Sequence, residues 1–141
     1  MQRKASAIWQ GGIKDGKGSI TTESGVLSAT PYSFSTRFEN VPGTNPEELI
    51  GAAHAGCFSM ALSLMLGEAG IQPERIDTQA AVTLEKTEGG FSITKVHLDV
   101  KVRAPGADRA KFEAAAAKAK TGCPVSKLLN AAITMNAKLV A

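Results

Sequence analysis

Residues 44–70 read T-N-P-E-E-L-I-G-A-A-H-A-G-C-F-S-M-A-L-S-L-M-L-G-E-A-G, and this stretch predicts one long apolar helix that carries a thiol near its middle. Asn45 is a preferred N-cap residue and Pro46 suits the first helical position. Glu48 follows the cap by three residues, which is the spacing of a capping box. Gly67 and Gly70 mark the expected end of the helix. The rest of the chain has to be arranged around this helix.

The apolar residues of the helix leave no broad polar face. They are Leu49, Ile50, Ala52, Ala53, Phe58, Met60, Leu62, Leu64, Met65 and Leu66. A helix that is apolar on all sides has to be covered on nearly all sides. Cys57 is therefore a thiol held inside a core or an interface, where a cysteine can be a chemically inert packing residue.

Length and composition indicate one globular domain, residues 1–141, of ordinary hydrophobic content. The chain is 43% hydrophobic and 21% charged. Its net charge of +3 is small, its basic residues are dispersed, and its few aromatic residues form no stacking platform. These features argue against a nucleic-acid-binding protein.

The location we expect is the cytoplasm, without a membrane partner. The N-terminus shows no apolar run of signal-peptide length, and polar residues interrupt the longest apolar segment, residues 49–66. In the cytoplasm a stable structural disulfide is rare. Two cysteines in such a protein indicate free thiols or a catalytic redox pair.

Alternating and turn-forming patterns predict strands on both sides of the helix. The strands are expected at residues 5–10, 19–23, 32–38, 78–86, 91–103 and 133–139, with a β-bulge near Thr94. Further helices are expected at residues 108–120 and 124–129. This order predicts an α+β fold with mostly antiparallel sheets around the long central helix.

The central helix also predicts the oligomeric state. A single domain of this size has few elements left to wrap a helix that is apolar on all sides. Exchange of sheets and helices with a second copy would supply the cover, so we expect an intertwined homodimer.

Cys57 needs a cation if its thiolate is to react. Burial raises the pKa of a thiol, and the field of a helix N-terminus fades within the first turn. One arginine at about 4 Å contributes roughly 4 kcal/mol at an effective dielectric near 20, enough to reverse a moderate shift. Arg37, expected on the strand face opposite Tyr32 and Phe38, is the candidate.

Cys123 stands in a different setting, before Pro124 at the expected start of a short helix. Its sulfur would face unpaired backbone N–H groups and could become a thiolate or a leaving group without a separate cation. The spacing of the two cysteines excludes a CxxC motif, and spacing alone does not say whether they meet. Two cysteines and two histidines at unrelated positions give no metal signature.

Two other functions stay open from these residues. His54 and Cys57 share a helix face, which would permit a Cys–His hydrolase or transferase, although such a histidine is more often a satisfied core residue. A small-molecule-binding dimer with inert thiols is the non-catalytic alternative.

Four segments together carry a resemblance to a known family. They are K-G-S-I-T-T-E-S-G-V-L (17–27), P-Y-S-F-S-T-R-F-E (31–39), the helical stretch preceded by Gly43 (43–70), and A-K-T-G-C-P-V-S-K-L-L (119–129). The chain resembles the OsmC and organic hydroperoxide resistance family over nearly its whole length, with both cysteines in matching contexts.

The resemblance implies a thiol peroxidase that acts on organic hydroperoxides, less well on hydrogen peroxide, in oxidative or osmotic stress. It implies that Cys57 is the peroxidatic cysteine, Cys123 the resolving cysteine, Arg37 the activating arginine and Glu47 its acidic partner. It also implies an intertwined dimer with the sites at the interface, no cofactor, and a dithiol reductant of the lipoyl type.

Helix geometry adds one expectation about these residues. Ten residues separate Glu47 from Cys57, which a continuous helix places about 15 Å apart. One arginine cannot contact both within a single helix. We therefore expect Arg37 to connect Cys57 of one subunit with Glu47 of the other, unless the helix breaks near Gly51.

Overall fold

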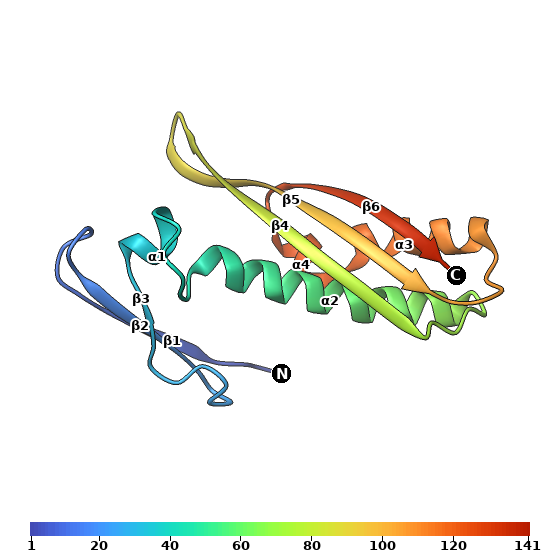
Figure 1. The fold of residues 1–141 in the computed structure, drawn as a ribbon, viewed down its shortest axis with the longest axis horizontal. Helices are drawn as coiled ribbons and strands as arrows, with labels where there is room; N and C mark the ends of the chain where they lie inside the picture. Colours follow the sequence, from blue (N-terminus) through green and yellow to red (C-terminus); the bar gives the residue numbers. More distant parts are fainter. The chain divides into compact units, whose positions relative to one another are not determined.

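The structure is a computed structural model that describes residues 1–141, which divide into two compact units, residues 1–49 and 50–141. The first unit holds strands β1 (Ala5–Gln10), β2 (Lys17–Thr22) and β3 (Thr30–Tyr32), and helix α1 (Phe34–Phe38) (Figure 1). Helix α2 (Pro46–Glu68) begins in the first unit and runs through the second. The second unit also holds β4 (Arg75–Thr87), β5 (Gly90–Arg103), α3 (Arg109–Gly122), α4 (Pro124–Leu128) and β6 (Ala132–Val140). The α+β class is confirmed.

The first unit is a three-stranded antiparallel sheet without a hydrophobic core of its own. Its strands follow the order β1-β2-β3. The rings of Trp9 and Tyr32 lie 5.5 Å apart across the sheet, and a Cβ atom on Gly18 would collide with both rings. Gly16 is the only residue of this unit that is buried in the single chain. The apolar residues of β1 are therefore left for another surface to cover.

The segment around Arg37 differs from the predicted strand. Strand β3 ends at Tyr32, and the following residues form α1. The reason is a capping box: the Thr36 N–H donates to Ser33 Oγ, and the Ser33 N–H donates to Thr36 Oγ1 at 2.9 Å. The Phe34 and Phe38 rings then stack one turn apart, with centroids separated by 4.9 Å. The alternation of polar and aromatic residues was misleading here.

The second unit contains a mixed sheet in the order β4-β5-β6. Strands β4 and β5 are antiparallel, and their pairing passes from Thr83–Lys95 directly to Leu84–Ile93. Thr94 is thus the extra residue of a β-bulge, as the sequence predicted. Strand β6 runs parallel to β5, which the sequence did not indicate. A parallel pair needs a long crossover connection, and α3 and α4 supply it.

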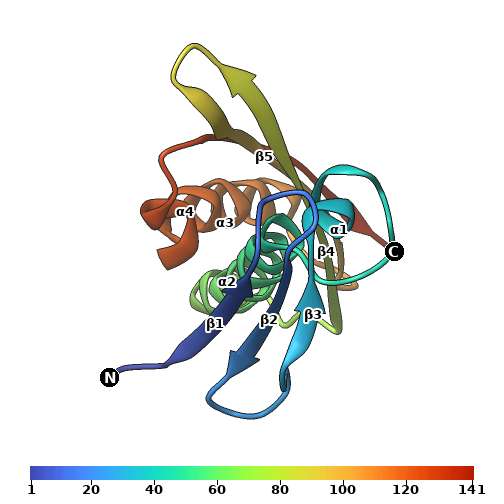
Figure 2. The same cartoon turned by 90° about the vertical axis from the view of Figure 1, so that its left-hand side faces the viewer.

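The core of the second unit lies between this sheet and its helices, and Figures 1 and 2 show α2 and α3 along one face of the sheet. Phe58, Leu62 and Leu66 of α2 are fully buried there. Alternate residues of β5 and one face of α3 complete the core, among them Val96, Leu98, Val100, Val102, Phe112, Ala116 and Ala119.

Helix α2 is continuous through Gly51, so the alternative of a break at that residue is wrong. Gly51 faces β4, where an added Cβ atom would make ordinary van der Waals contact with the Ala80 carbonyl oxygen at 3.4 Å. On the other side of α2, Met60 is 79% exposed and Leu64 is 63% exposed in the single chain. By length and composition α2 would also suffice to cross a membrane, a property that core helices of soluble proteins share.

Candidate active site

The two cysteines meet in the second unit, although 66 residues separate them in the sequence. The sulfur atoms of Cys123 and Cys57 are in hydrogen-bonding contact at a distance of 3.0 Å, and neither residue is in a disulfide. Cys57 lies on α2 and is half-buried, whereas Cys123 is fully buried. Cys123 is the N-cap residue of α4, as predicted, but its side chain makes no capping hydrogen bond. Its sulfur faces Cys57 instead.

Opposing contacts set the acidity of Cys57. Burial raises the pKa of the Cys57 thiol, and the hydrogen bond with Cys123 raises it further. The backbone N–H of Val125 donates to the Cys57 sulfur and lowers the pKa, but the net direction is upward. The sequence analysis did not find the Val125 N–H. Its signal was Pro124, which starts α4 and leaves the next backbone N–H groups without partners inside the helix.

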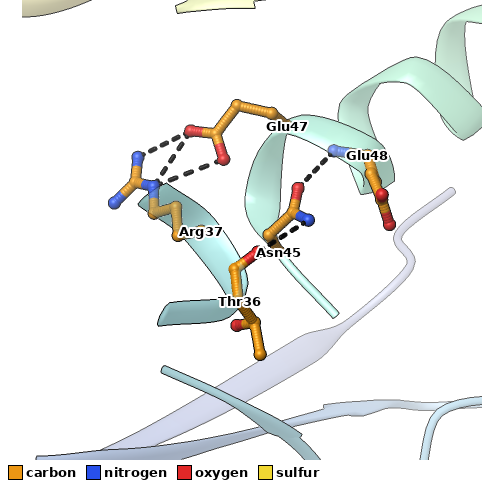
Figure 3. A network of polar contacts seen from close by, with 5 residues as sticks. All are labelled: Thr36, Arg37, Asn45, Glu47 and Glu48. Carbon is orange, nitrogen blue, oxygen red and sulfur yellow. Dashed lines mark hydrogen bonds and ion pairs between the residues drawn. The ribbon is translucent and has the colours of Figure 1, made fainter. Parts of the chain in front are cut away.

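Arg37 and Glu47 meet in the first unit (Figure 3). Arg37 Nη2 and Nε donate to Glu47 Oε1 at 2.8 Å and 3.0 Å, and Nε also reaches Oε2 at 3.3 Å. Such a fork fixes the plane of the guanidinium. Nε and one N–H of Nη2 are committed to Glu47, so Nη1 and the second N–H of Nη2 are left for a substrate or a thiolate.

The two elements that carry this ion pair are joined by their caps, as Figure 3 shows. Asn45 Oδ1 accepts from the Glu48 N–H at 2.8 Å and so caps α2 as predicted. Asn45 Nδ2 donates to the Thr36 carbonyl oxygen at 3.3 Å, and Thr36 Oγ1 donates to the carbonyl oxygen of residue 44 at 3.0 Å. The start of α2 therefore positions α1, and with it Arg37.

Arg37 also lines a small cavity of about 190 Å³ in the first unit. The walls are mainly aromatic and aliphatic side chains, contributed by Trp9, Ile13, Tyr32, Phe34 and Phe38. The Arg37 guanidinium carbon lies 5.1 Å from the centre of the Phe38 ring, a cation–π contact. This arrangement combines a fixed cation with room for an apolar group.

His54 is completely buried and turned toward α4. Its Nε2 atom lies 2.7 Å from Ser126 Oγ, and its Nδ1 atom has no hydrogen-bond partner. Burial lowers the pKa of His54, so its ring is neutral at pH 7. The hydrogen bond that a Cys–His couple would require is thus made with a serine.

The predicted site residues form two pairs, Cys57 with Cys123 and Arg37 with Glu47, each within its own unit. The action of Arg37 on Cys57 stays a prediction. No group of three or more histidine, cysteine, aspartate or glutamate side chains is placed to hold a metal ion.

Comparison with known proteins agrees with the resemblance. The model of the OsmC-like protein family matches residues 38–138. Peroxiredoxin OsmC of Escherichia coli is 58% identical over 99% of this chain and 97% of its own length. Organic hydroperoxide resistance protein OhrB of Bacillus subtilis is 32% identical over 78% of this chain and 79% of its own length.

Solved structures show the same fold. The crystal structure of Bacillus subtilis OhrB has a TM-score of 0.68 at 28% identity and covers 97% of this chain and 98% of its own. An OsmC-like protein of Mycoplasma pneumoniae has a TM-score of 0.78 at 14% identity, covering 100% of this chain and 99% of its own. The chain therefore belongs to the OsmC-like family, together with peroxiredoxin OsmC and the organic hydroperoxide resistance proteins.

Proposed function

We propose that this chain reduces organic hydroperoxides to alcohols, and hydrogen peroxide less well, through a Cys57 sulfenic acid and a Cys57–Cys123 disulfide. Its family and its 58% identity to a peroxiredoxin make it a cysteine-based peroxidase of peroxide stress. The substrate, the order of the steps and the reductant go beyond this class and are proposed here. Because the peroxiredoxin aligns with 99% of the chain, we treat residues 1–141 as one catalytic domain.

The observation that carries the proposal is the 3.0 Å distance between the two sulfur atoms. A disulfide has an S–S length of about 2.05 Å, so the sulfurs need to approach by only about 1 Å. Two cysteines that serve only for packing need not contact each other, yet these two are in hydrogen-bonding contact although 66 residues separate them. This contact favours a redox pair over the binding protein with inert thiols.

The proposed reaction has three steps. The Cys57 thiolate attacks the terminal oxygen of ROOH, an S–O bond forms, the O–O bond breaks, and the alkoxide takes up a proton to leave as alcohol. The sulfur loses two electrons and becomes a sulfenic acid. The Cys123 thiol then displaces the hydroxyl group, forming the disulfide and releasing water. An external dithiol reduces this disulfide by thiol exchange and is itself oxidised.

Arg37 supplies the positive charge that the buried thiol lacks. A guanidinium beside Cys57 would offset the upward shift of the thiol pKa and stabilise the charge that grows on the leaving oxygen. The cavity beside Arg37 is lined largely by apolar side chains, which supports an apolar R group on the hydroperoxide.

We place Arg37 and Cys57 of one site on different subunits. Arg37 is tied to Glu47 at the start of α2, and ten residues of continuous helix span about 15 Å. Arg37 is therefore expected to act on the Cys57 thiol of a second copy.

The intertwined homodimer has independent support within each unit. The first unit buries only Gly16 by itself, and α2 leaves Met60 and Leu64 largely exposed. Apolar surfaces of this kind mark an interface. A second copy, and not a lipid bilayer or a nucleic acid, is the cover that we propose. The cytoplasm remains the expected location and a dithiol, by resemblance of the lipoyl type, the expected reductant.

The test is the mass of the intact reduced protein before and after one equivalent of cumene hydroperoxide. We expect the loss of two hydrogen masses, and a Cys57–Cys123 cross-link in the peptide map. The Cys57→Ser variant is the matched control and should keep its mass. Two unmodified thiols in the wild type would reject the proposal. If both thiols of the wild type stayed free, the Cys–His hydrolase or transferase would be the next function to test.

A further inference from the structure

Helices α2 and α4 are joined by two side-chain contacts that lie one helical turn apart. Cys57 contacts Cys123, and His54 contacts Ser126. His54 precedes Cys57 by three residues on α2, and Ser126 follows Cys123 by three residues. Residues with this spacing share a helix face. The redox pair therefore has a neighbouring contact that holds the same two segments together and cannot be oxidised.

The His54–Ser126 contact is buried and polar. His54 is 0% exposed and Ser126 is 9% exposed. A buried hydrogen bond is far more costly to break by removing one partner than its net contribution suggests, because the other partner is left without water. The contact consequently fixes the position of α4 on α2, and it does so without any charge because burial keeps His54 neutral.

The residue next to Ser126 is the one that donates to the reactive sulfur. The Val125 N–H points at Cys57, and Val125 lies between Cys123 and Ser126 in the sequence. A displacement of Ser126 would move this N–H and the Cys123 sulfur together. Losing the alignment would therefore remove one contact that raises the pKa of the Cys57 thiol and one that lowers it.

We propose that His54 and Ser126 are positioning residues, which hold the segment 123–126 so that the Val125 N–H and the Cys123 sulfur stay on Cys57. Neither residue touches the reacting atoms. This inference deepens the proposed function, and its test uses alkylation, which requires no peroxide.

The test is the pH dependence of Cys57 alkylation by iodoacetamide in the reduced protein, with peptide mass spectrometry to distinguish Cys57 from Cys123. Ser126→Ala and His54→Gln should speed Cys57 alkylation at pH 7 by about three- to tenfold, because the Cys123 contact that they release raises the pKa of the Cys57 thiol by more than the Val125 contact lowers it. Ser126→Thr keeps the hydroxyl group and should return the rate to near that of the wild type. The two primary variants act from opposite sides of the contact, so one of them suffices if the other does not fold.

Ser59→Ala is the matched control. Ser59 also lies on α2, but its hydroxyl contacts the Ala55 carbonyl oxygen and Thr78 Oγ1, both at 2.8 Å, and not α4. Its alkylation profile should equal that of the wild type. Unchanged profiles in Ser126→Ala and His54→Gln, or an equal change in Ser59→Ala, would overturn the proposal. The alkylation profiles of the two variants could differ from that of the wild type in a protein that forms no disulfide with hydroperoxide. That result would reject the proposed function but keep the positioning role.

Discussion

The sulfur atoms of Cys123 and Cys57 lie 3.0 Å apart, so the group that we propose as resolving is in place before any oxidation. In the reduced protein this contact works against reactivity, because it contributes to the raised pKa of the Cys57 thiol. After oxidation the same proximity favours the disulfide over further oxidation. The contact therefore slows the reaction of Cys57 with the hydroperoxide but protects the sulfenic acid from further oxidation.

Cys123→Ser separates these two effects. The variant should still form a sulfenic acid at Cys57, but the Cys57–Cys123 disulfide cannot form, so turnover should slow to the rate at which the external dithiol attacks the sulfenic acid directly and should decline as the sulfenic acid is overoxidised. Dimedone labelling followed by mass measurement detects the sulfenic acid, and excess hydroperoxide should convert it to sulfinic acid. Sustained turnover at the wild-type rate in Cys123→Ser would contradict the role given to Cys123.

Arg37→Lys tests whether the guanidinium fork is required. A lysine keeps the charge but cannot make the bidentate contact that orients Arg37 on Glu47. We expect kcat/KM for cumene hydroperoxide to fall by roughly 100-fold, the lower end of the cost of losing one aligned donor at a developing charge. Glu47→Gln should give a smaller loss, because Arg37 retains its charge.

Arg75→Lys is the matched control for that substitution. Arg75 makes the same type of fork with Asp77 on β4, where Nη2 and Oδ1 are 2.7 Å apart, but both side chains are well exposed. The control should leave kcat/KM within about twofold of the wild type, since exposed ion pairs contribute little. If kcat/KM fell equally in both variants, Arg37 would have no specific role in the reaction.

The sequence predicted those parts of the fold that depend on local signals. The cap at Asn45 located the start of α2, and the change of phase in β5 located the bulge at Thr94. The strand predicted through Arg37 failed because the capping box of Ser33 outweighed a two-residue alternation. The sequence contained a local signal in each case, and the stronger signal determined the backbone conformation.

The candidate site was predicted residue by residue, but the contacts inside it were not. The Val125 N–H reaches Cys57 only because α4 packs on α2, and His54 finds Ser126 for the same reason. Contacts between segments that are distant in sequence leave no periodic pattern. The resemblance identified the cysteines, whereas the raised pKa of Cys57 required the structure.

Met60→Glu tests the proposed dimer through the exposed side of α2. If Met60 is buried against a second copy, the loss of its apolar contacts weakens dimerisation by at least about 2 kcal/mol, or roughly thirtyfold in Kd. Sedimentation equilibrium should then show monomer at concentrations where the wild type is dimeric. Gln72→Glu is the control, because Gln72 is an exposed polar residue after α2 and adds no apolar surface. A monomeric wild type would contradict the dimer directly.

His54 predicts how stability depends on pH. Burial lowers the pKa of His54 in the folded protein, while the unfolded chain has a histidine pKa of about 6.5. Above that pH both states are neutral and His54 adds no pH dependence. Below it the unfolded chain takes up the proton first, so the free energy of unfolding should fall as the pH decreases toward the folded pKa.

The measurement is urea denaturation of the wild type and of His54→Gln at pH 7.5 and at pH 5. The wild type should lose more stability over this interval than the variant, although the variant starts lower because the Ser126 contact is weakened. His97→Gln is the control, since the His97 side chain is 41% exposed on the sheet and should leave the difference nearly unchanged. If His54→Gln showed the same decrease as the wild type, the folded histidine would be able to take up its proton freely. That result would be incompatible with a His54 ring that is buried and neutral between α2 and α4.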